Sequence, residues 1–166
     1  MDLKIEKIKE SRINEVDFSK LSFGKTFSDH MFICEYKDGS WQNPTIKPYG
    51  ALTLDPSTSV FHYGQAVFEG MKAYKDDKGQ VFLFRPQENY KRINKSCERL
   101  AMPAFPEEWF DQALRPLVDI DSEWIKPGFG NALYLRPFMI ATTAGVQAAP
   151  AKNYLFMIIT APVQAY

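Results

Sequence analysis

The stretch NALYLRPFMIATTA, residues 131–144, decides the fold together with KNYLFMIITAP, residues 152–162. Both segments are apolar along most of their length and carry no helix signal beyond their composition. We therefore interpret them as two central strands of a sheet, each buried on both faces. The small residues between them, TTAGVQAAPA, are typical of a loop.

Two polar side chains interrupt the first of these strands. Tyr134 and Arg136 are two residues apart, so in a strand they emerge on the same face, about 7 Å from each other. Burying an unpaired guanidinium costs on the order of several kcal/mol. Arg136 must therefore form a structural ion pair with an acid or open onto a water-filled cleft, and these alternatives are equally open. The cleft implies a ligand that is part apolar and part anionic.

Length and composition predict one domain, or at most two small units, with a substantial core. The chain has 166 residues, of which 45% are hydrophobic and 14% aromatic, enough to bury an interior. Its 20 basic and 20 acidic residues cancel and form no long block of one sign, which gives no support for nucleic-acid or anionic-membrane partners. The first ten residues lack the apolar core of a secretory signal. We expect a soluble, cytoplasmic protein.

The cysteines and histidines do not form a recognisable reactive or metal-binding pattern. Cys34 and Cys97 are far apart, so we expect two reduced thiols packed as small hydrophobic groups. His30 and His62 have no acidic partner at metal-ligand spacing. We therefore expect no metal site.

The first half of the chain predicts mainly antiparallel strands. Residues 1–22 form a charged lead that we expect to be loosely anchored, and residues 30–41, HMFICEYKDGSW, predict two strands joined at an Asp-Gly turn. Residues 70–86 predict a second hairpin around a D-D-K-G turn. In the segment before it, FHYGQAVF, we expect a strand that turns at Gly64 and a short helical stretch through Phe68.

Two helices are predicted between the hairpin and the central strands. The first begins at Pro86, a favourable first-turn residue, and its apolar positions recur at spacings of three and four. These positions are Tyr90, Ile93, Cys97 and Leu100. The second begins at Pro106 and should kink or break at Pro116. The predicted architecture is α+β, a mostly antiparallel sheet with helices on one side.

Few residues outside the central strands suggest chemistry. Arg92 lies off the apolar stripe of its helix, so it is either on a solvated face or in contact with an anion such as phosphate or carboxylate. The sequence has no GxGxxG, GxxxxGK[ST], GxSxG or HExxH motif. Among 14 lysines, only Lys72 has mostly apolar neighbours, and we assign it no catalytic role.

Four long segments together resemble a known family. They are FGKTFSDHM at 23–31, FHYGQAVFEGMKAY at 61–74, LFRPQENYKRINKSCERLAMP at 83–103 and YLRPFMI at 134–140. Their order and approximate spacing resemble those of the branched-chain amino acid aminotransferases, which are fold-type-IV pyridoxal-phosphate enzymes. The resemblance implies that residues 23–166 form the small N-terminal α+β domain, after the lead at 1–22. It also implies that the C-terminal domain with the Schiff-base lysine is absent from this chain, which alone should be inactive.

The resemblance also implies roles for individual residues towards cofactor and substrate. Arg92 matches the arginine that reaches the phosphate of pyridoxal 5'-phosphate. Phe23, Tyr63 and Phe68 match residues that line the pocket for the substrate side chain. No lysine of this chain matches the Schiff-base position, so we assign no catalytic residue here.

Two further matches concern substrate choice and the neighbouring subunit. Tyr134 and Arg136 match the pair that lets one pocket accept either the aliphatic side chain of leucine, isoleucine or valine, or the distal carboxylate of glutamate or 2-oxoglutarate. The loop that contains Gly145 and Val146 resembles one that approaches the active site of the other subunit. The resemblance therefore implies a homodimer with amino acid and 2-oxo acid substrates.

Other interpretations remain open at this point. A different fold-type-IV enzyme, such as a D-amino acid aminotransferase or an aminodeoxychorismate lyase, is one alternative, although FGKTFSDHM and YLRPF argue against it. A stand-alone domain that keeps the fold and acts only in dimerisation or binding is another.

Overall fold

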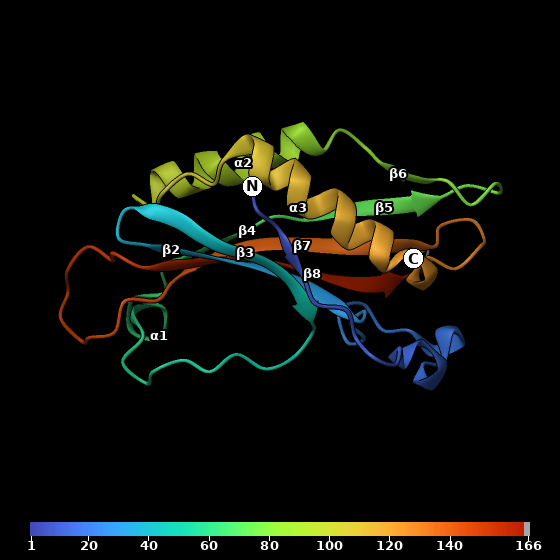
Figure 1. Cartoon of the computed structure of the whole chain (residues 1–166), viewed down its shortest axis with the longest axis horizontal. Helices are drawn as coiled ribbons and strands as arrows, with labels where there is room; N and C mark the ends of the chain where they lie inside the picture. Colours follow the sequence, from blue (N-terminus) through green and yellow to red (C-terminus); the bar gives the residue numbers. More distant parts are fainter. Residues whose placement is uncertain (165–166) are drawn as a thin grey trace.

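A single sheet of eight strands runs through the computed structural model, which describes residues 1–164 (Figure 1). Its order is β1-β3-β2-β8-β7-β5-β6, and β4 pairs with β7 beside this path. Every pairing is antiparallel except that of β1 with β3. The strands are β1 (Lys4–Ile5), β2 (His30–Lys37), β3 (Ser40–Pro48), β4 (Ala66–Phe68), β5 (Met71–Lys75), β6 (Val81–Leu83), β7 (Ala132–Ala141) and β8 (Tyr154–Val163).

The helices lie mainly over one face of this sheet. Figure 1 shows α2 (Pro86–Arg99) and α3 (Glu107–Ile120) together on that face, and the short α1 (Ser59–Tyr63) on the other side. The predicted α+β architecture is therefore confirmed. The helix does not break at Pro116, because α3 continues through it, and the alternative of a kink at that residue stays a prediction. Three 3-10 turns complete the helical segments: η1 (Arg12–Glu15), η2 (Phe18–Lys20) and η3 (Ser122–Trp124).

The core lies between the two long helices and the sheet. The apolar stripe of α2 buries Ile93 and Cys97 as predicted, whereas Leu100 is exposed. Below the helices, the rings of Phe105 and Phe156 are stacked with their centroids 3.9 Å apart. The two long helices therefore cover only one face of the central strands.

Strand β7 differs from its sequence prediction on its second face. Leu133, Leu135 and Met139 are fully buried beneath the helices, but the alternate residues Tyr134 and Arg136 are only half-buried. The expectation that both faces are buried is therefore wrong for β7, because the two long helices, α2 and α3, lie over the other face. It holds for most of β8, where eight of ten residues are buried. The half-open face of β7 carries the candidate site.

The segment around Gly64 folds in the reverse order to the predicted one. Its helix, α1, precedes Gly64, and its strand, β4, follows it. Gly64 has φ 63°, and its N–H donates to the Val60 carbonyl oxygen at 3.0 Å, so it ends the helix in the left-handed region. Beyond it the chain extends, because Phe68 and its neighbours pair with β7.

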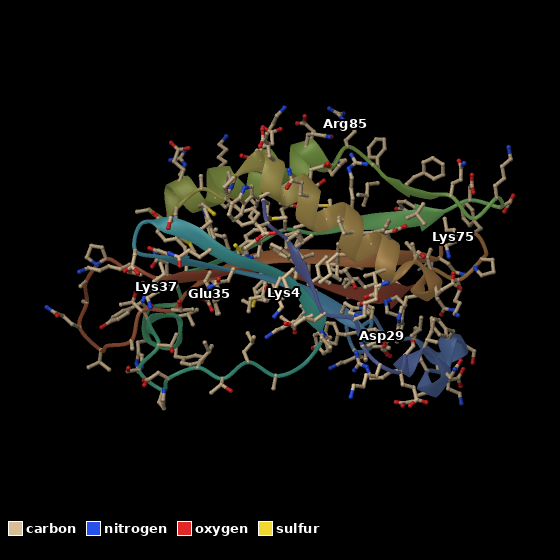
Figure 2. The ribbon with its side chains drawn as sticks, in the orientation of Figure 1. Lys4, Asp29, Glu35, Lys37, Lys75 and Arg85 are labelled. Carbon is tan, nitrogen blue, oxygen red and sulfur yellow. The ribbon has the colours of Figure 1, made fainter. Side chains whose placement is uncertain are left out.

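The N-terminal lead is held firmly, contrary to expectation. The Asp29 carboxylate accepts hydrogen bonds from the Ser11 hydroxyl, the Arg12 N–H and the Trp124 indole N–H. Figure 2 shows Asp29 where the lead meets the sheet. Burial would raise the pKa of Asp29, but these hydrogen bonds and the Arg12 charge hold the pKa below its usual value. One buried carboxylate thus joins the lead to the sheet and to η3.

His30 supplies a second anchor for the lead. Its Nδ1 lies 2.7 Å from a carboxylate oxygen of Asp121, and its Nε2 accepts the Ile8 N–H at 3.0 Å. An acceptor at Nε2 places the proton on Nδ1. This partner of His30 could not be predicted from local spacing, because Asp121 is 91 residues away in the sequence.

Candidate functional site

The candidate site begins with Arg136 on the half-open face of β7. Its Nε and Nη2 donate to the Tyr134 hydroxyl oxygen at 3.1 and 3.0 Å. Its guanidinium carbon lies 4.5 Å from the centre of the Phe68 ring and 5.4 Å from that of Tyr134. The cation is therefore held by two aromatic rings and one hydroxyl.

Arg136 has no acidic partner within residues 1–164, since none of the ion pairs formed there includes it. The structural ion pair that the sequence left open is therefore not formed in the described chain. Nε and Nη2 are engaged by Tyr134, while Nη1 can donate to another acceptor. Arg136 can thus bind an anion from outside this part of the chain.

A small cavity adjoins the two side chains. Its volume is about 140 Å³, and it is lined by Phe23, Gly24, Phe27, Tyr134, Arg136, Ile159, Thr160 and Ala161. The ring of Phe23 meets that of Tyr134 edge-on, with centroids 5.0 Å apart. The structure therefore brings together three of the predicted site residues around a mainly apolar space with one cationic wall.

The Tyr134 side chain fills the space beside Gly70 that a side chain at position 70 would need. A β-carbon built on Gly70 would overlap the Tyr134 hydroxyl oxygen, so any larger residue would displace the ring. Phe68, two residues before Gly70, is 66% exposed on the same face, and its ring packs against the Arg136 guanidinium. Phe68, another of the predicted site residues, therefore lies beside Tyr134 and Arg136 and contacts the Arg136 guanidinium.

Arg92 projects from α2 beside this segment and is bound to Glu69. Its Nε and Nη2 donate to the two carboxylate oxygens of Glu69, the Nη2 contact being 2.9 Å. The Arg92 side chain is 69% exposed, whereas that of Glu69 is 4% exposed. Both alternatives from the sequence are thus partly met: Arg92 is on a solvated flank, and it already binds one anion.

Glu69 is the residue that sequence reasoning missed. Besides Arg92, it accepts hydrogen bonds from Asn89 Nδ2 at 2.8 Å and from the Gly70 N–H at 2.9 Å. Burial would raise the pKa of Glu69, but these hydrogen bonds and the Arg92 charge hold the pKa below its usual value. An acid directly after Phe68 in the family-like segment was the available signal.

Tyr63 and Val146 form a separate pair. The Tyr63 hydroxyl donates to the Val146 carbonyl oxygen, and the Gly145 N–H donates to the Ser57 carbonyl oxygen at 3.0 Å. Both side chains of the pair are exposed, Val146 to 69%. Within residues 1–164, no hydrogen bond or ring contact joins this pair to Tyr134 or Arg136. The predicted substrate-binding residues therefore fall into two groups, and Arg92 stands apart from both in its pair with Glu69.

Three general features of residues 1–164 bear on the class of protein. No group of three or more His, Cys, Asp and Glu residues there could hold a metal ion. None of the helices in that range is both long and apolar enough to cross a membrane. Both cysteines are buried free thiols, as predicted.

No protein-family model matches the chain, but individual proteins do. It is 51% identical over 151 residues to the branched-chain-amino-acid transaminase 1 of Bacillus subtilis (strain 168), a match that covers 90% of this chain and 42% of that protein. The chain spans less than half the length of the curated relatives it matches.

Solved structures agree on the fold. A branched-chain amino acid aminotransferase from T.th. with pyridoxamine 5'-phosphate is similar with a TM-score of 0.59 and 25% identity, over 81% of this chain and 40% of that one. The T.th. enzyme complexed with N-(5'-phosphopyridoxyl)-L-glutamate gives a TM-score of 0.56 at 23% identity, with the same coverage.

Proposed function

We propose that this chain, a homologue of the N-terminal part of the branched-chain aminotransferases, supplies the substrate pocket of a pyridoxal 5'-phosphate-dependent aminotransferase. The complete enzyme would move an amino group between leucine, isoleucine or valine and 2-oxoglutarate. The observation that carries the proposal is Arg136, a cation held against Phe68 and Tyr134 with no carboxylate partner in the described chain.

The pocket would serve two kinds of substrate with the same walls. The rings of Phe23 and Tyr134 offer an aliphatic side chain an apolar surface. The remaining N–H groups of Arg136 offer a carboxylate two or more charged donors. Because the Tyr134 hydroxyl already holds two guanidinium nitrogens, the cation need not leave the pocket when the substrate is aliphatic.

The residues present also fit one end of the cofactor. Arg92 keeps three N–H groups beyond those bound to Glu69 and is 69% exposed, so it could hold the phosphate of pyridoxal 5'-phosphate. When bound, this cofactor supplies an electron sink for bond breaking at the substrate α-carbon. Arg92 would anchor the phosphate, while Arg136 and Tyr134 would orient the substrate side chain.

The remaining functions are assigned to the complete protein. The Schiff-base lysine would lie in a C-terminal domain, corresponding to the part of the relatives that this chain does not span. Residues 1–22 and 23–166 would act as one N-terminal unit, inactive alone. We further propose a cytoplasmic homodimer in which the exposed Tyr63–Val146 pair lines the substrate pocket near the subunit contact.

The test is transamination by the complete gene product that contains this chain. With pyridoxal 5'-phosphate, it should transfer the amino group of leucine, isoleucine or valine to 2-oxoglutarate. D-alanine and aminodeoxychorismate should not react. Turnover of either of these in place of leucine would assign the protein to another fold-type-IV activity, and absence of all turnover would favour a non-catalytic binding domain.

A further inference from the structure

We infer that Glu69 is a positioning residue that fixes the Arg92 guanidinium in the orientation needed to bind the cofactor phosphate. The inference rests on the proposed function, in which Arg92 anchors that phosphate. Glu69 itself would not touch the cofactor, since its side chain is buried and both of its oxygens face protein donors.

Glu69 is held in place at both ends. Its backbone N–H donates to the Pro137 carbonyl oxygen on β7 at 2.8 Å. Its carboxylate receives Asn89 Nδ2 from α2 and the Gly70 N–H from its own chain. A carboxylate with this many partners has little freedom to move, so it offers Arg92 a fixed point on the sheet.

Glu69 also determines which edge of Arg92 is available. The pair uses the Nε–H and one N–H of Nη2, leaving the other Nη2 N–H and both N–H groups of Nη1. These remaining groups form the terminal edge of the guanidinium, which can hold two oxygens of one phosphate. Without Glu69, the exposed arginine could turn this edge in several directions.

Two opposing effects decide the sign of the contribution. A flexible arginine loses conformational freedom when it binds a ligand, which lowers the affinity by up to about thirtyfold. Because Glu69 already holds the Arg92 side chain in one orientation, little of this freedom is left to lose when the phosphate binds. The negative charge of Glu69 also repels the phosphate, but across an exposed guanidinium in water this amounts to only about three- to fivefold. The net expectation is that Glu69 strengthens phosphate binding by roughly five- to tenfold.

The neighbours of Glu69 support a role in the site and not only in the fold. Phe68 lies under Arg136, and Gly70 makes room for the Tyr134 hydroxyl. Three consecutive residues therefore each support a different polar side chain of the candidate site. The Glu69 side chain accepts hydrogen bonds from both Asn89 and Arg92 of α2.

The experiment compares four variants of the complete gene product with the wild type. They are Glu69→Gln, Arg92→Ala, the double variant, and Glu88→Gln as a control, since Glu88 is an exposed acid that pairs with Lys91 on the same helix. Dissociation constants are measured for pyridoxal 5'-phosphate and for pyridoxal, which lacks the phosphate. Thermal unfolding of the cofactor-free proteins checks folding, and Glu69→Asp replaces Glu69→Gln if the latter does not fold.

Glu69→Gln should weaken pyridoxal 5'-phosphate binding by about five- to tenfold and pyridoxal binding by less than twofold. Arg92→Ala should cost the phosphorylated ligand about a hundredfold, and adding Glu69→Gln to it should change nothing further. Glu88→Gln should match the wild type. An unchanged or tighter constant for Glu69→Gln, an equal loss with pyridoxal, or an effect that persists without Arg92 overturns the inference while leaving the proposed function intact. If Arg92→Ala itself binds the phosphorylated ligand normally, the phosphate assignment fails and the inference with it.

Discussion

Replacing Arg136 with methionine would separate the two substrate classes that the pocket is proposed to accept. Methionine keeps a long apolar side chain but removes the charge and all five donors. Arg136 has no acidic partner in residues 1–164, so within that part of the chain the substitution leaves no buried carboxylate unpaired. The effect on activity should therefore come from the substrate.

The acidic substrates should lose the most. A hydrogen bond between charged groups contributes about 1.5–3 kcal/mol, and a guanidinium can give a carboxylate two of them. Taking the lower value for each, Arg136→Met should cost about 3 kcal/mol of transition-state stabilisation, or roughly 150-fold in kcat/KM for glutamate and 2-oxoglutarate.

Leucine should lose much less. Its side chain would contact the rings that line the cavity, and these stay in place. What the substitution removes is the stacking of Arg136 on Phe68 and its hydrogen bonds to the half-buried Tyr134 hydroxyl. At about 1 kcal/mol for a partly exposed cation–π contact, the loss in kcat/KM would be roughly fivefold.

The assay is the kinetics of the two half-reactions of the complete enzyme, with leucine and with glutamate as amino donors. The ratio of the two values of kcat/KM should shift towards leucine by about thirtyfold in Arg136→Met. Arg136→Lys, which keeps the charge but loses the fork, should fall between the wild type and the methionine variant. Equal losses for both donors would show that Arg136 acts on the structure of the pocket and would refute the reasoning.

Three further predictions concern the support of the site and the fold. Gly70→Ala should lower kcat/KM for both donors by on the order of tenfold or more, because the new methyl group displaces Tyr134; an active variant with normal kinetics would contradict the close approach. The pKa of Asp29 is lower in the folded than in the unfolded protein, so its contribution to stability is complete above about pH 4 and is lost as the pH falls through the folded value. Urea unfolding should therefore show that the stability difference between wild type and Asp29→Asn shrinks between about pH 6 and about pH 3, and a constant difference would count against it. Burial raises the pKa of Cys34 to about 12 and that of Cys97 to about 11, so iodoacetamide at about pH 8 should label neither thiol in the native protein and both after unfolding; rapid native labelling would show that the core opens readily.

The pairing of Tyr134 with Arg136 could be predicted because it depends only on the strand period. Side chains two positions apart in a strand point to the same face of the sheet, whatever surrounds them. Whether Arg136 forms an ion pair with an acidic side chain could not be predicted, because that depends on which distant segments of the chain lie on the same face of β7. The structure places the rings of Phe23 and Phe68 there, from segments far from β7 in the sequence.

The order of α1 and β4 could not be predicted for a related reason. The residues on either side of Gly64 are about equally compatible with a helix and with a strand, so their secondary-structure propensities do not decide between the two. Pairing decides instead: Val67 lies opposite Met139 on β7 and is buried in the core, where β4 contacts α2. The anchoring of the lead by Asp29 could not be predicted either, because the carboxylate joins the lead to Trp124, which is 95 residues away in the sequence.

The position of Glu69 follows from a gap in the sheet that only the folded chain shows. Strands β4 and β5 both pair with β7 in one register, with Phe68 opposite Phe138 and Met71 opposite Leu135. Between them, Glu69 lies opposite Pro137, whose nitrogen has no hydrogen to donate, so the ladder is interrupted there.

At this gap the alternation of the chain still holds. Gly70 turns to the half-open face, where Tyr134 takes the space that a side chain would fill. Glu69 turns to the opposite face, where Arg92 of α2 meets it. Two successive residues at one interruption in the sheet thus contact Arg92 on one face and Tyr134 on the other, so the proposed phosphate-binding and substrate-binding groups are both supported from the same short segment.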